Sequence, residues 1–124
     1  MANRITAWCI DCEDPNGLAA FWTAVLGWVV TDSDAEGVSI KPSTEAGWGI
    51  DFLVVRDGPK RGKNRLHLDV NPTDRDQDAE LQRLLELGAR RVDIGQGDVT
   101  WHVLADPEGN EFCLLRRRVE PELT

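Results

Sequence analysis

The stretch that decides the fold reads Val99-Thr100-Trp101-His102-Val103-Leu104-Ala105-Asp106-Pro107-Glu108-Gly109-Asn110-Glu111-Phe112-Cys113-Leu114-Leu115. Its centre, Asp106-Pro107-Glu108-Gly109, matches a type I turn, which favours Asp at the first position, Pro at the second and Gly at the fourth. The runs on either side are rich in β-branched, aromatic and aliphatic residues, which is typical of strands. The stretch therefore predicts a β-hairpin in which one carboxylate, Glu111, is set in an otherwise apolar strand.

The first half of the chain is predicted to form one helix with short strands. Asp14 and Pro15 suit the N-cap and the first helical position. Apolar residues then recur at helical spacing as far as Gly27, a residue that commonly ends helices. Trp8 and Trp22 are expected in the core between this helix and its sheet. Strands are expected at residues 5–12, 28–31, 37–41 and 50–56.

The second half repeats this order after a polar loop at residues 57–64. A strand is expected at 65–70, a helix at 74–87 and a short strand at 90–94, followed by the hairpin. Residues 51–56 align with residues 111–116 at an offset of 60 (111 − 51), which indicates an internal repeat. The sequence thus predicts a β-α-β-β-β unit used twice in a single domain, residues 1–124, with module 1 at about 5–56, a linker at 57–64 and module 2 at about 65–118.

Composition limits the partners and the compartment. The chain has 124 residues and a net charge of −8, which argues against nucleic acid or an anionic membrane as the main partner. Its three cysteines form an odd set without paired metal-binding motifs, which is typical of reduced thiols in the cytoplasm. The N-terminus leads straight into a strand without the pattern of a signal peptide. We therefore expect a cytoplasmic protein.

Strand alternation divides the side chains between two faces of each sheet. In residues 65–70, the apolar Leu66, Leu68 and Val70 are expected to lie under the second helix, so that the polar residues face the other way. The same reasoning applies to the first, fourth and last strands. The residues expected on the face away from the helices are Ala7, Cys9, Asp11, Asp51, Leu53, Val55, Arg65, His67, Asp69, Glu111, Cys113 and Leu115.

The hairpin motif, residues 106–112 after a short strand, resembles the last hairpin of the vicinal oxygen chelate superfamily. That superfamily includes glyoxalase I, extradiol dioxygenases and bleomycin-resistance proteins, and residues 63–69 resemble a run typical of its small glyoxalase-like members. The resemblance implies an α+β fold in which two βαβββ modules form a cup-shaped incomplete β-barrel with the helices outside. It also implies a small-molecule ligand in the cup and a homodimer.

The resemblance further implies a divalent metal held by residues of the first, fourth, fifth and last strands. His67 and Glu111 match the fifth-strand and last-strand positions, and Asp51 lies where glyoxalase I-like members carry a Glu. Counting seven residues back from each expected helix cap, Asp74 and Asp14, gives His67 and Ala7, so the first ligand is missing. A nickel, zinc, manganese or iron ion on His67, Glu111 and Asp51 would supply Lewis-acid chemistry.

Each candidate residue also has a structural interpretation. Without a metal, His67 and Glu111 can form a hydrogen-bonded pair, with Glu111 as a candidate general base. Arg65 and Asp69 are expected to pair with each other, and Cys113 to pack as a small hydrophobic residue. The candidate ligand contacts are Trp48, Trp101, Arg65, Asp69 and Cys9, and the two tryptophans suit either core packing or stacking on a flat ligand.

Two functions follow from the sequence. The first is a metal-dependent lyase, isomerase or dioxygenase-type enzyme acting on a small oxygenated metabolite, with His67 and Glu111 as its catalytic residues. The second is a non-catalytic protein of the bleomycin-resistance type that sequesters a flat small molecule. The carboxylates Asp51 and Glu111 favour the enzyme, whereas Ala7 at the first ligand position favours the binding protein.

Overall fold

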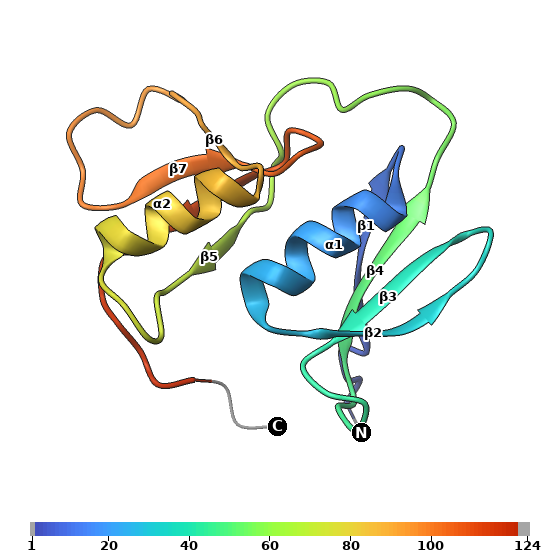
Figure 1. Cartoon of the computed structure of the whole chain (residues 1–124). Coiled ribbons are helices and arrows are strands. Elements are labelled where there is room, and N and C mark those ends of the chain that lie inside the picture. The colour runs from blue at the N-terminus through green and yellow to red at the C-terminus, as the bar shows by residue number, and fades with distance from the viewer. Residues whose placement is uncertain (1, 122–124) are drawn as a thin grey trace. The chain divides into compact units, whose positions relative to one another are not determined.

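A computed structural model describes residues 2–121 (Figure 1). The chain divides into two compact units, one up to Pro59 and the other from Lys60 onward. Each unit contains one helix and one four-stranded mixed sheet, so that the fold is α+β as the sequence predicts. Within residues 2–121, neither helix is long and apolar enough to cross a membrane.

The first unit is built as β-α-β-β-β. Its elements in chain order are β1 (Ala7–Cys12), α1 (Pro15–Leu26), β2 (Val29–Ser33), β3 (Gly37–Lys41) and β4 (Gly49–Val54). The strand order in the sheet is β1-β4-β3-β2, with β1 parallel to β4 and the other neighbours antiparallel.

The second unit has the same topology. Its elements are β5 (Leu68–Val70), α2 (Gln77–Leu87), β6 (Arg90–Arg91), β7 (His102–Ala105) and β8 (Glu111–Leu114). The strand order is β5-β8-β7-β6, again with the first and last strands parallel. Two βαβββ modules are therefore present, and the repeat predicted from the sequence is confirmed.

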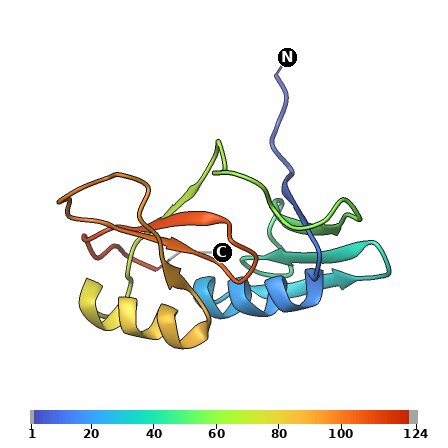
Figure 2. The ribbon, with the colours of Figure 1, turned by 90° about the horizontal axis from the view of Figure 1, so that it is seen from above.

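Each helix buries an apolar stripe against its own sheet. In the first module α1 packs on β2, β3 and β4. Figure 2 shows α2 along one face of the second sheet, beside β7 and β8. Both cores consist of large aliphatic and aromatic side chains. Burial of such apolar groups is the main favourable term in folding. The buried residues are Leu18, Phe21, Trp22, Val38, Ile40, Ile50 and Phe52 in the first module, and Leu81, Leu84, Val103, Leu104, Phe112 and Leu114 in the second.

The hairpin formed by β7 and β8 folds around a buried aspartate. The backbone N–H of Gly109 donates to the carbonyl of Asp106 at 2.9 Å, which closes the expected turn. The side chain of Asp106, 1% exposed as a residue, accepts hydrogen bonds from the backbone N–H groups of Glu108 and Asn110 at 2.9 and 3.0 Å. A buried carboxylate is tolerated here because backbone donors satisfy it.

The structure corrects three details of the sequence prediction. Helix α2 begins at Gln77 with Asp76 as its N-cap, two residues after the expected Asp74. The strand expected at 65–70 spans only Leu68–Val70, and Leu66 is 69% exposed instead of buried under α2. Trp8 is 41% exposed, whereas Trp22 is buried as expected. Trp8 stays accessible because β1 is an edge strand and α1 packs on the other three strands.

Candidate metal and ligand site in the second module

Several polar side chains of the second module lie on the sheet face opposite α2. Parallel pairing places Asp69 of β5 directly beside Cys113 of β8. The residues on either side of Cys113, Phe112 and Leu114, are buried in the core, so that alternation turns Cys113 and its register partner Asp69 to the other face. Glu111, two residues before Cys113, lies on that face as well. The face assignment made from the sequence is therefore correct for these residues.

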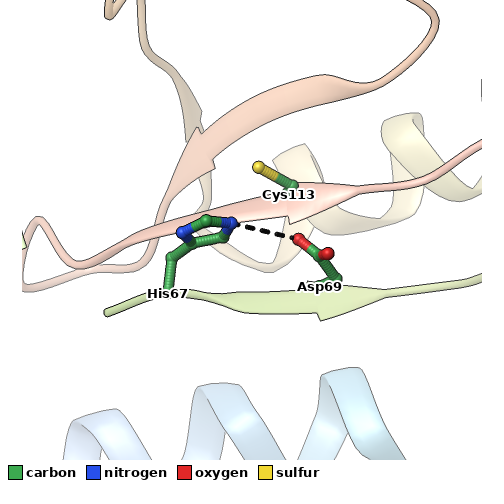
Figure 3. Close-up of side chains that lie close together, drawn as sticks. All are labelled: His67, Asp69 and Cys113. Atoms are coloured by element: carbon green, nitrogen blue, oxygen red, sulfur yellow. Dashed lines mark ion pairs between the residues drawn. The ribbon is translucent and has the colours of Figure 1, made fainter. Parts of the chain in front are cut away.

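Three of these residues bring metal-ligating atoms together (Figure 3). The ring nitrogen Nε2 of His67 lies 3.3 Å from Oδ1 of Asp69, and Sγ of Cys113 completes a group whose ligand atoms all lie within 4.8 Å of one another. The side chains of His67 and Asp69 are 45% and 51% exposed, while Cys113 is buried. A ligand can therefore reach the group from the His67 side.

The surroundings keep the Cys113 thiol protonated in the absence of a cation. Burial raises the pKa of Cys113, and the charge of Asp69 together with a hydrogen bond to that carboxylate raises it further. Lys63 opposes this rise. In this state the buried thiol is a weak hydrogen-bond donor to Asp69, and its raised pKa disfavours a nucleophilic role.

Glu111 is held by the segment that precedes β5. Its Oε1 accepts a hydrogen bond from the backbone N–H of Asn64 at 2.9 Å, and its Oε2 lies 3.1 Å from Nζ of Lys60. The Asn64 side chain also donates to Asn110 at 2.9 Å. Burial raises the pKa of Glu111, but the bonds from Asn64 and Lys60 outweigh it, and the pKa lies below the ordinary value. The carboxylate is therefore ionised and both of its oxygens are paired, and its role as a general base stays a prediction.

Asp69 pairs with His67 instead of with Arg65, the partner expected from the sequence. Alternation places all three residues on one face, but the backbone leaves the strand pattern before Leu68, and Arg65 is exposed. Lys60 and Asn64 were not predicted as partners, because residues 57–64 have the composition of a solvent-exposed linker. The cationic and amide side chains of that loop were the only sequence signal of a partner for Glu111.

Strand register in the first module identifies the true counterpart of His67. Ile10 pairs with Phe52, and Leu68 pairs with Phe112, the residue 60 positions after Phe52. The residue before Ile10, Cys9, is therefore equivalent to His67, and Ala7 is not. Counting from the helix caps fails because nine residues separate His67 from its cap (76 − 67), whereas five separate Cys9 from Asp14 (14 − 9).

Cys9 and Asp51 form the corresponding pair in the first module. They are register partners on the face of the sheet opposite α1, which agrees with the face assigned from the sequence. Cys9 is exposed and Asp51 is partly buried. Both residues belong to the first module. The roles predicted for them, Cys9 as a ligand contact and Asp51 as a metal ligand, stay predictions.

The candidate tryptophans are partly accessible within their own modules. Trp48 is 37% exposed and meets Trp28 edge to face, with ring centroids 5.4 Å apart. Trp101 is 39% exposed and precedes β7. Its neighbour His102 pairs with Leu114 in the sheet, so it lies on the α2 side, where it lines a shallow hollow at the start of that helix. His102 is therefore separate from the His67 face.

Comparison with known proteins defines the class of this chain. Residues 7–115 match the family model described as a glyoxalase-like domain. Because the match spans most of the sequence, the chain belongs to the glyoxalase-like family of the vicinal oxygen chelate superfamily. No functionally curated protein matches it in sequence.

Solved structures with the same fold have low sequence identity. One is a glyoxalase/bleomycin resistance protein/dioxygenase family enzyme from Burkholderia phytofirmans PsJN, 17% identical, with a TM-score of 0.62 over 88% of this chain and 94% of that chain. Another is the fosfomycin resistance protein FosX from Listeria monocytogenes, 14% identical, with a TM-score of 0.68 over 94% and 93%. A glyoxalase-related enzyme from Fulvimarina pelagi is 14% identical, with a TM-score of 0.65 over 91% and 87%. These likenesses establish the fold.

Proposed function

We propose that this protein is an enzyme that acts on a small oxygenated metabolite with the help of a divalent cation bound in the second module. The observation that carries the proposal is the set of donor side chains on the sheet face opposite α2, with His67, Asp69 and Cys113 within 4.8 Å of one another. Nitrogen, carboxylate and thiol donors on one accessible face fit a divalent transition metal. A cation bound there polarises an oxygen of the substrate.

The residues of the chain have distinct parts in this proposal. His67 would offer Nε2 to the cation, and Asp69, whose Oδ1 lies 3.3 Å from that nitrogen, would offer a carboxylate oxygen beside it. Glu111, paired with Lys60 and Asn64, fixes the segment beside the site and keeps a negative charge there. Nickel, zinc, manganese and iron are the candidate cations, and a lyase, isomerase or dioxygenase-type reaction is proposed by analogy with relatives named as enzymes.

Metal analysis tests the proposal. Protein purified without a metal-affinity tag is expected to contain a near-stoichiometric transition metal by mass spectrometry, and His67→Ala is expected to lose it. The loaded protein is then screened for turnover of small oxygenated substrates. Absence of metal, even after incubation with nickel, zinc, manganese and iron salts, would contradict the metal-dependent enzyme.

The second candidate is a protein that sequesters a flat small molecule. The accessible indole rings of Trp48 and Trp101, 37% and 39% exposed, favour it because exposed aromatic faces can stack on a planar ligand. Arg65 and Cys9 are further candidate contacts. This function predicts quenching of tryptophan fluorescence by a planar ligand in metal-free protein, reduced in Trp48→Leu and in Trp101→Leu.

The remaining parts of the proposal concern the whole protein. We propose one domain, composed of modules at about residues 5–56 and 65–118, acting as a homodimer in the cytoplasm. Members of this superfamily bind small molecules and often form dimers. Light scattering coupled to size-exclusion chromatography tests the dimer, which is expected to have twice the 13.8 kDa mass of one chain.

A further inference from the structure

The paired strands β5 and β8 bring three chemically different metal-ligating side chains close together. His67 and Asp69 come from the segment of β5, and Cys113 comes from the neighbouring strand β8. Asp69 and Cys113 are register partners, and His67 reaches Asp69 along the same face. Rigid strand pairing, rather than a flexible loop, therefore fixes the relative positions of two of the three donors.

We infer that His67 Nε2, a carboxylate oxygen of Asp69 and Cys113 Sγ together bind one thiophilic divalent cation of the zinc and cobalt type. The inference rests on the proposed metal-dependent function and names its ligands and its metal class. On binding, Cys113 gives its proton to solvent and ligates as the thiolate, while His67 ligates in its neutral form. Three protein ligands leave a fourth position open, as in catalytic zinc sites.

The distances are compatible with this site. Zinc lies about 2.0–2.3 Å from nitrogen, oxygen and sulfur ligands, so tetrahedral ligand atoms are roughly 3.3–3.8 Å apart. The His67–Asp69 contact of 3.3 Å already falls at this spacing. The widest separation in the group is at most 4.8 Å, and rotation of the exposed His67 and Asp69 side chains can close the difference of about 1 Å.

Glu111 is the alternative ligand, and its contacts argue against it. Both oxygens are engaged, one with the Asn64 backbone and the other with Lys60. Recruiting Glu111 to a cation would break a charge-assisted hydrogen bond and leave the largely covered Lys60 ammonium without this partner. Cys113 needs only to lose a proton, and thiolate selects zinc and cobalt over manganese and magnesium.

Cobalt substitution distinguishes the two ligand sets. Metal-free full-length protein is titrated with Co²⁺ alone, and the near-ultraviolet thiolate-to-cobalt charge-transfer band is recorded. We expect the band in the wild type and in Cys12→Ser, a matched control for loss of a thiol in the other module. Cys113→Ser is expected to lose the band and to bind Co²⁺ and Zn²⁺ more than about 100-fold more weakly, since loss of an outer-shell partner alone costs roughly 10–100-fold.

The carboxylates are separated in the same way. Asp69→Asn is expected to weaken Zn²⁺ binding by more than about 10-fold, whereas the control Asp98→Asn, an exposed carboxylate of the same module, is expected to leave it unchanged. Circular dichroism verifies that each variant is folded. Cobalt that binds without the thiolate band, and is lost in Glu111→Gln but kept in Cys113→Ser, would overturn this ligand set while leaving the metal-dependent function standing. Failure of the wild type to bind any of these cations would overturn both.

Discussion

Glu111 joins the segment before β5 to the last strand, and this role can be measured separately from any chemistry. We expect Glu111→Gln to lower the free energy of unfolding by about 1–2 kcal/mol near neutral pH, because a partly buried carboxylate loses its ion pair and a charge-assisted hydrogen bond. Urea unfolding followed by circular dichroism measures the difference between variant and wild type. Glu86→Gln, at an exposed carboxylate of the same module, is the matched control.

The stability difference between wild type and Glu111→Gln is also expected to depend on pH, and the pKa of Glu111 fixes the sign of this dependence. The folded-state pKa of Glu111 lies below the ordinary value of 4.5, so its stabilising effect is fully present above that value and is lost as the pH falls through the folded-state pKa. The stability difference between wild type and Glu111→Gln is therefore expected to stay constant from neutral pH down to about 4.5 and to shrink as the pH falls further. A difference that stays constant below pH 4.5 as well would contradict the ion pair.

Individual site residues were only partly predictable from the sequence. The period-two pattern of the strands correctly places Asp69, Glu111 and Cys113 on the face away from α2, because backbone geometry alone sets it. The partners of these side chains were not predictable. They depend on how residues 60–64 fold back toward β8, and no periodic pattern encodes the path of an irregular segment.

At the scale of elements, the start of α2 provides a sharp test. Asp76 accepts a hydrogen bond from the backbone N–H of Ala79 at 2.8 Å, whereas Asp74 pairs with the exposed Arg75 beside it. We expect Asp76→Ala to lower the free energy of unfolding by about 1 kcal/mol, the usual value of an N-cap. Asp74→Ala is expected to change it by less than about 0.5 kcal/mol, since exposed ion pairs contribute little. Equal losses in urea unfolding would show that the cap is misassigned.

The sequence interpretation placed the start of α2 two residues too early, at Asp74 instead of Asp76. Asp74 and Asp76 are both acceptable caps by residue type, and the apolar period that follows does not distinguish starts two residues apart. Helix α1 was unambiguous because Pro15 follows Asp14 directly, and its cap is confirmed by a 3.1 Å hydrogen bond from Gly17. The comparison of Ala7 with His67 has a different cause, because nine residues separate His67 from Asp76 whereas five separate Cys9 from Asp14, and no common count from the caps relates the two.

The two β-α-β-β-β modules place a phenylalanine at equivalent positions of their cores. Phe52 of β4 and Phe112 of β8 are 0% and 1% exposed and occupy the same place in their sheets. Each Phe→Ala substitution is expected to lower the free energy of unfolding by about 3–5 kcal/mol, the range for a large buried aromatic side chain. Leu53→Ala, on the other face of β4 and 36% exposed, is expected to cost much less. A small loss at only one phenylalanine would contradict the equivalence of the modules.

At the scale of the molecule, the sequence predicted the α+β class and the repeated unit because these depend on periodicity, turn chemistry and the order of elements. Its single-domain expectation stays a prediction, and the tryptophans allow a direct test. Four of the five, Trp8, Trp22, Trp28 and Trp48, belong to the first module, whereas the inferred metal ligands all belong to the second. Tryptophan fluorescence therefore reports mainly on the module that does not bind the cation.

If the two modules unfold as one cooperative domain, zinc stabilises both. A cation that binds only the folded state adds about 2.7 kcal/mol at a free concentration 100 times its dissociation constant. At roughly 4 °C per kcal/mol for a chain of this size, Tm is expected to rise by about 10 °C. The rise is expected to coincide by circular dichroism and by tryptophan fluorescence, to reverse with a chelator, and to be absent in Cys113→Ser. A shift seen by circular dichroism while the fluorescence transition stays in place would mean that the modules unfold separately, because linkage reaches only the unit that unfolds with the site.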